Sequence, residues 1–113
     1  MPKKGFGDLQ VRSFEAKLGG KTAQGFVVRK GNRFFAYRNL CKHLPVTLDL
    51  EDDVFFTHDK SNLQCHLHGA IYEIETGLCS AGPCQGARLD EIEIVEQDTR
   101  LVITVPERFF QLE

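Results

Sequence analysis

The chain has 113 residues, of which 42% are hydrophobic and 27% charged, which is enough apolar material for one modest core. Its formal net charge of −2 argues against a nucleic-acid-binding surface. The N-terminal segment has no apolar stretch of a secretory signal, and no apolar run is long enough to cross a bilayer. We therefore expect a single cytoplasmic domain over residues 1–113, without nucleic-acid or membrane partners.

Short β-rich segments follow one another along the first two thirds of the chain. Residues 24–30 (QGFVVRK) and 33–38 (RFFAYR) flank Gly31-Asn32, which predicts a tight hairpin. Short apolar segments are then expected to form strands at 54–57, 62–65 and 70–74. Gly and Pro punctuate this middle region, which is typical of long loops between strands.

A second hairpin is predicted near the C-terminus. Residues 88–95 (RLDEIEIV) alternate apolar and charged side chains, and 100–105 (RLVITV) follow after a short turn. We expect Phe109 and Phe110 to pack back on the body of the domain. No segment has a strong helical pattern, so the predicted fold class is all-β, a small antiparallel sandwich or barrel.

Two segments carry the residues suited to chemistry, Cys41-Lys42-His43 and Cys65-His66-Leu67-His68. A zinc finger usually pairs Cys with Cys and His with His, whereas each segment here supplies one of each kind. Two sulfide-bridged irons need four terminal ligands, and two such loops could each give a Cys to one iron and a His to the other. A single zinc ion on the same four residues is the alternative.

The pattern Cys-x-His, a spacer and Cys-x-x-His-Gly resembles the signature of the Rieske family. The resemblance extends through residues 36–43 and 68–77, and Gly82-Pro83 lies where the family has a proline loop over its cluster. It covers about residues 24–105 and implies a Rieske-like fold with a cluster-binding region at about 39–86, formed by two loops. It also implies one [2Fe–2S] cluster per chain, with these ligands: Cys41, His43, Cys65 and His68.

The resemblance also implies how the cluster is tuned. High-potential members place a serine and a tyrosine after the second ligand pair, where they donate hydrogen bonds to cluster sulfur. The matching positions here are Ala70 and Tyr72, so one donor is absent and Tyr72 is present, while Pro83 belongs to the covering loop. We expect a low to intermediate reduction potential. His66 offers a second imidazole, and the family spacing favours His68 as the ligand.

The implied function is electron transfer by a carrier that is not itself an enzyme. Such ferredoxin-like components pass electrons from a reductase to a terminal oxygenase. Alternatives are an accessory small subunit of a larger reductase, similar to nitrite reductase subunits, a redox sensor, or a redox-silent structural zinc module. A whole Rieske oxygenase needs a second iron-binding domain, for which 113 residues leave no room.

Two further features allow more than one interpretation. Cys79 and Cys84 bracket the covering loop, and we interpret them as small loop residues in preference to a redox pair, since cytosolic disulfides are rare. An acidic run lies between the two ligand pairs: Asp49, Glu51, Asp52 and Asp53. We interpret it as a solvated loop, with a docking patch for a basic redox partner as the alternative.

Overall fold

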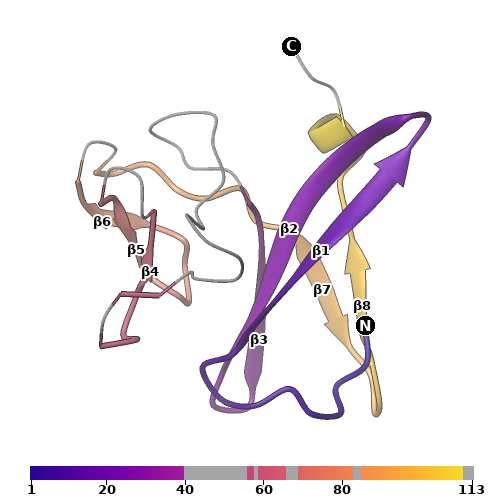
Figure 1. The fold of residues 1–113 in the computed structure, drawn as a ribbon, viewed down its shortest axis with the longest axis horizontal. Coiled ribbons are helices and arrows are strands. Elements are labelled where there is room, and N and C mark those ends of the chain that lie inside the picture. The colour runs from indigo at the N-terminus through magenta and orange to yellow at the C-terminus, as the bar shows by residue number, and fades with distance from the viewer. Residues whose placement is uncertain (40–55, 58, 66–68, 83–84, 111–113) are drawn as a thin grey trace. The chain divides into compact units, whose positions relative to one another are not determined.

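The computed structural model describes residues 1–39, 56–57, 59–65, 69–82 and 85–110 (Figure 1). The chain forms two compact units, one of residues 1–38 with 91–113 and one of residues 39–90. The predicted all-β class is confirmed, because every strand pair in the described ranges is antiparallel. No helix within these ranges has the length and hydrophobicity needed to cross a membrane.

The first unit is built on a three-stranded antiparallel sheet in the order β1-β2-β3. It comprises β1 (Val11–Leu18), β2 (Lys21–Lys30) and β3 (Arg33–Arg38). The predicted hairpin at Gly31-Asn32 is confirmed: Lys30 pairs with Arg33, and Gly31 supplies a φ of 64° at the first position of the turn. The sequence reading missed β1 and began β2 three residues too late.

A second hairpin of the same unit joins β7 (Glu93–Glu96) to β8 (Leu101–Thr104). Its turn is closed by a hydrogen bond from the Gln97 amide to the Arg100 carbonyl, at 2.9 Å. The predicted terminal hairpin is confirmed, although residues 88–92 of the predicted segment precede the strand. The short 3-10 helix η1 (Glu107–Phe110) follows.

The core of this unit forms where the alternating apolar side chains of both hairpins meet. Its buried members include Val27, Ala36, Ile92, Leu101, Phe109 and Phe110. The expectation that Phe109 and Phe110 pack back on the body is confirmed, since they are only 2% and 6% exposed. Arg38 secures η1: its Nη2 donates to the Phe109 carbonyl at 3.2 Å, and its guanidinium lies 4.9 Å from the Phe109 ring centroid.

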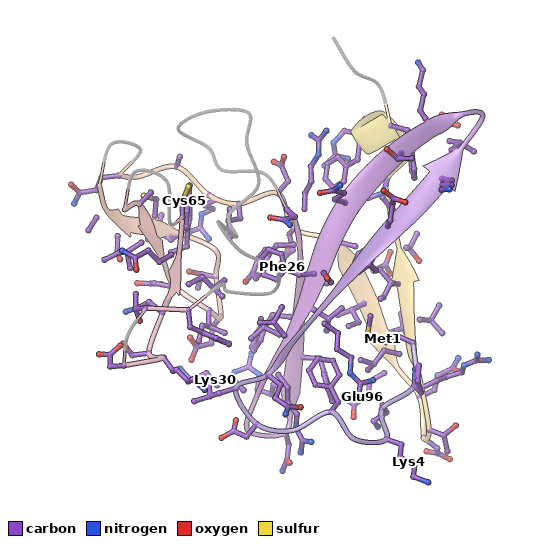
Figure 2. The ribbon with its side chains drawn as sticks, viewed as in Figure 1. Met1, Lys4, Phe26, Lys30, Cys65 and Glu96 are labelled. Carbon is purple, nitrogen blue, oxygen red and sulfur yellow. The ribbon has the colours of Figure 1, made fainter. Side chains whose placement is uncertain are left out.

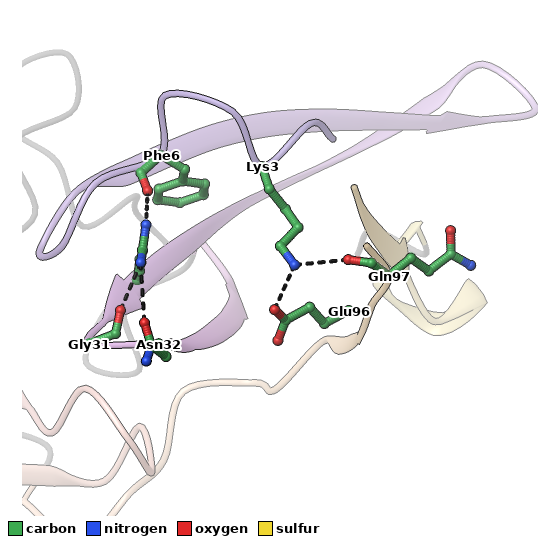
Figure 3. A network of polar contacts seen from close by, with 7 residues as sticks. Lys3, Phe6, Gly31, Asn32, Glu96 and Gln97 are labelled. Carbon is green, nitrogen blue, oxygen red and sulfur yellow. Dashed lines mark hydrogen bonds and ion pairs between the residues drawn. The ribbon is translucent and has the colours of Figure 1, made fainter. Parts of the chain in front are cut away.

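Polar contacts fasten the N-terminal segment to both hairpins (Figure 3). Lys3 Nζ lies 2.7 Å from a carboxylate oxygen of Glu96 and donates to the Gln97 carbonyl at 2.9 Å. At the other hairpin, Arg29 donates to the carbonyl oxygens of Phe6 and Gly31. The segment therefore joins parts of the chain that are far apart in sequence.

The second unit has much shorter strands. A three-stranded antiparallel sheet contains β4 (Leu63–Gln64), β5 (Ile71–Tyr72) and β6 (Cys79–Ala81) in that order. The strands predicted at 62–65 and 70–74 are confirmed in shortened form. Of the segment predicted at 54–57, Phe56 pairs with Leu63 in a single bridge, and residues 54–55 lie outside the described ranges.

Candidate functional site

Among the four predicted cluster ligands, Cys65 alone falls within the described ranges. Cys41, His43, His68 and the covering-loop residue Pro83 lie outside them. The same holds for three groups that the sequence singled out: His66, Cys84 and the acidic run at 49–53. The ligand set as a whole therefore stays a prediction, and the site is built here from Cys65 and its surroundings.

Cys65 lies at the start of a tight turn that leads from β4 to β5. Its amide donates to the Ala70 carbonyl at 2.8 Å, and its carbonyl accepts from the Gly69 amide at 2.8 Å. Gly69 closes the turn with a φ of 78°, a conformation that glycine adopts without steric cost. Figure 2 labels Cys65 next to the short sheet of the second unit. Its side chain is fully buried. A hydrogen bond thus joins the first and last residues of the Cys-x-x-His-Gly motif, and the Cys65 thiol is withdrawn from solvent.

A second loop approaches this turn closely at Gly82. A Cβ atom on Gly82 would lie 2.7 Å from the Ala70 Cα, and Gly82 has a φ of 100°. The base of this loop is held by hydrogen bonds from the Cys79 amide to the Ala87 carbonyl and from the Gly86 amide to the Cys79 carbonyl, at 2.7 and 3.0 Å. Glycine at position 82 therefore lets the loop that contains Pro83 start in contact with the turn that begins at Cys65.

Tyr72 on β5 and Cys79 on β6 are cross-strand partners. In the chain, β5 follows the turn that begins at Cys65, and β6 precedes Gly82. Tyr72 is fully buried and Cys79 is 1% exposed, and the Cys79 thiol lies 3.2 Å from the Ala81 carbonyl oxygen. Cys79 is therefore a buried residue of β6, and its interpretation as a small loop residue was wrong. The role of Tyr72 as a hydrogen-bond donor to cluster sulfur stays a prediction.

A polar turn just before β4 escaped the sequence analysis. Asp59 Oδ1 accepts hydrogen bonds from the Ser61 hydroxyl at 2.7 Å, the Ser61 amide at 3.1 Å and the Thr57 hydroxyl at 2.8 Å. These bonds, the Ser61 hydroxyl foremost, lower the pKa of Asp59 from 3.8 to about 2. The available signal was an aspartate flanked two residues away by hydroxyl side chains, which is typical of a turn. The Thr57 amide donates to the Asn62 carbonyl at 2.9 Å, so the turn closes directly before β4 begins at Leu63.

The residues present fit a [2Fe–2S] cluster. A thiol buried in a hydrogen-bonded turn, next to a loop whose glycine permits contact, is a protected position for a thiolate ligand. Two Cys and two His in the paired loops are the donor set in which imidazoles replace thiolates on one of the two irons. A cluster bound there would exchange one electron at a time. In the described ranges, no three His, Cys, Asp or Glu residues gather as metal ligands, and three of the predicted four lie outside those ranges.

Comparisons with known proteins agree with this assignment. Residues 7–105 match the family described as Rieske [2Fe-2S] domain, a span that contains both Cys/His pairs and Gly82-Pro83. The search of curated proteins finds no match.

Solved structures share the fold at low sequence identity. The ferredoxin of carbazole 1,9a-dioxygenase from Nocardioides aromaticivorans IC177 is 23% identical over 91% of each chain, with a TM-score of 0.68. A chain in a complex of reduced oxygenase and oxidized ferredoxin of carbazole 1,9a-dioxygenase is 21% identical over 91% of this chain and 96% of its own, with a TM-score of 0.71. The terminal oxygenase of carbazole 1,9a-dioxygenase from Novosphingobium sp. KA1 is 20% identical over 85% of this chain but 26% of its own, with a TM-score of 0.63.

Proposed function

Because this chain belongs to the Rieske [2Fe-2S] domain family, we propose that it is a ferredoxin-like carrier that passes single electrons from a reductase to a terminal oxygenase. Its cofactor is a [2Fe–2S] cluster, and its activity is electron transfer without bond-making chemistry of its own. The observation that carries the proposal is the family match across both Cys/His pairs, supported by the burial of Cys65.

The proposed ligands are Cys41, His43, Cys65 and His68. Cys65 begins the turn that Gly69 closes, and the adjoining loop reaches that turn at Gly82. Neutral imidazole carries less negative charge than thiolate, so two His ligands make the cluster easier to reduce than one with four Cys. A buried thiolate also benefits from the amides and apolar groups that keep water away from it.

The oxygenase partner is supported by the chains that share this fold. The similarity extends over 91% of a ferredoxin chain, whereas it covers about a quarter of a terminal oxygenase chain. Those proteins are named for a carbazole dioxygenase, and the substrate of the oxygenase served by the present chain is left open. The accessory-subunit alternative stays a prediction without an observation in its favour.

The cluster is tested by spectroscopy of protein purified without oxygen. Visible absorption from a red-brown protein, and a rhombic electron paramagnetic resonance signal of low average g after reduction, would establish a His-ligated [2Fe–2S] cluster. One zinc per chain with no colour, and failure of iron reconstitution, would contradict it and favour the structural zinc module.

The carrier role needs a separate experiment on partners. Chemically reduced protein should be reoxidised by a purified Rieske terminal oxygenase. In size-exclusion chromatography of the tagged chain, the protein should elute without a large partner. Stoichiometric co-elution with a large reductase would instead favour the accessory subunit.

A further inference from the structure

In the first unit, β3 and β7 are neighbours (Figure 1), but they are paired at one end only. Tyr37 and Glu91 form an antiparallel bridge there, and the Ile92 amide donates to the Ala36 carbonyl at 2.9 Å. From this hydrogen bond toward Phe34 on β3 and Ile94 on β7, the described residues form no further backbone hydrogen bond between the two strands. A groove of about 410 Å³ occupies the opening.

Backbone groups on both walls point into this groove. The two-residue turn makes Lys30 and Arg33 a hydrogen-bonded pair, so alternation along β3 directs the N–H and C=O of Phe34 away from β2. The turn bond between Gln97 and Arg100 sets the same alternation on β7, which directs the N–H and C=O of Ile94 away from β8. Across the part of the chain that is described, neither residue has a backbone partner on the facing strand.

The side chains of the groove add apolar walls and a charged rim. Phe34, Phe35 and Ile94 line it together with Ile92 and Pro106. Glu91 and Glu93 also line it, and both are exposed. Two guanidiniums are stacked on the phenylalanine rings of the β3 side: Arg29 lies 5.7 Å from the Phe34 ring centroid and Arg33 5.0 Å from that of Phe35. The β7 side is therefore acidic, and its open backbone edge lies between apolar side chains.

We propose that this groove receives an extended, basic segment of a partner protein, which adds as a strand to the open edge of β7. Apolar side chains of the incoming strand would face Phe34 and Ile94, and the alternate basic side chains would face Glu91 and Glu93. Strand addition satisfies backbone groups that are otherwise left to water, and charge complementarity selects the partner. The proposal does not rest on the electron-transfer function.

The test is hydrogen–deuterium exchange at single-residue resolution on the full chain with its cluster. The probe is a capped heptapeptide of alternating Lys and Val, compared with the same peptide carrying Glu in place of Lys. The Lys peptide should slow exchange of the Ile94 amide by about tenfold or more at saturation. The Val95 amide, already paired with Val102, serves as an internal reference that should not change.

Charge-reversal variants complete the experiment. Replacing both glutamates of the rim (E91K and E93K together) should lower the affinity for the Lys peptide by about tenfold. Glu15→Lys on β1 should change that affinity by no more than about twofold. The proposal is overturned if the Lys peptide fails to bind, if it binds without protecting Ile94, or if it protects Phe34 alone. Equal affinity for the Glu and Lys peptides would also overturn it.

Discussion

The two units of this protein hold their shape by different means. The first has strands of eight, ten and six residues whose side chains build a core. The second has strands of two or three residues, joined by turns that depend on Gly69 and Gly82. Strands so short are marginal by themselves. The comparison teaches that long paired strands and a buried core stabilise the first unit, whereas the second has buried side chains such as Leu63, Tyr72 and Ile74 but little regular pairing. We therefore expect the second unit to depend in addition on ligand bonds to a cluster.

Removing a cluster ligand should produce the largest difference in behaviour between the two units. Cys65→Ser should abolish visible absorption and bound iron, because a serine hydroxyl is a poor substitute for thiolate. Amides of the second unit should then exchange rapidly, while those of β2 stay protected, as measured by hydrogen–deuterium exchange. Cys79→Ala is the matched control and should keep its colour. Full iron content in Cys65→Ser would refute the ligand assignment.

A core deletion in the first unit should have the opposite pattern. Phe109→Ala should lower the free energy of unfolding by about 3–5 kcal/mol, because it removes a ring that is 2% exposed and leaves a cavity. Absorption per chain should not change under native conditions. Leu18→Ala, at a residue 46% exposed, should change the free energy of unfolding by less than about 0.5 kcal/mol, as measured by denaturant unfolding. Equal effects of the two substitutions would contradict the role of this core.

Two glycines in the second unit allow a matched test of the contact between its loops. Gly82 and Gly86 have φ values of 100° and 95°, so alanine at each should cost about 1–3 kcal/mol of backbone strain. Gly82→Ala should cost about 1 kcal/mol more, because its Cβ would meet Ala70, whereas nothing lies within 4 Å at Gly86. Denaturant unfolding and the rate of cluster loss to a chelator measure the difference. Indistinguishable variants would show that the contact is unimportant.

The smallest effect is expected at the turn before β4. The folded-state pKa of Asp59 is lowered to about 2, so its stabilising contribution is complete above its ordinary pKa of 3.8 and lost as the pH falls toward 2. Asp59→Asn should remove this acid dependence, while Asp98→Asn in the β7–β8 turn should keep it. Nuclear magnetic resonance titration of the Ser61 amide would follow the transition. An unchanged acid profile in Asp59→Asn would contradict the contribution of this turn.

Local signals accounted for much of the fold. Gly31-Asn32 between two β-rich segments predicted a hairpin that is confirmed, since turn chemistry acts over a few residues. Alternation in residues 100–105 predicted the terminal hairpin for a similar reason. In contrast, β1 was missed because edge-strand residues such as Glu15 and Lys17 are exposed and leave a weak apolar pattern.

By itself, the sequence determined the family and the kind of site, because ligand type and spacing are written in consecutive residues such as Cys65-His66-Leu67-His68. Only the tertiary structure decided that Gly82 touches Ala70, that Asp59 holds the turn before β4, and that β3 separates from β7. Those features depend on how distant backbone segments approach and which edge groups they leave unpaired. Such distances arise from packing of the whole chain and leave no periodic signal in any short stretch of it.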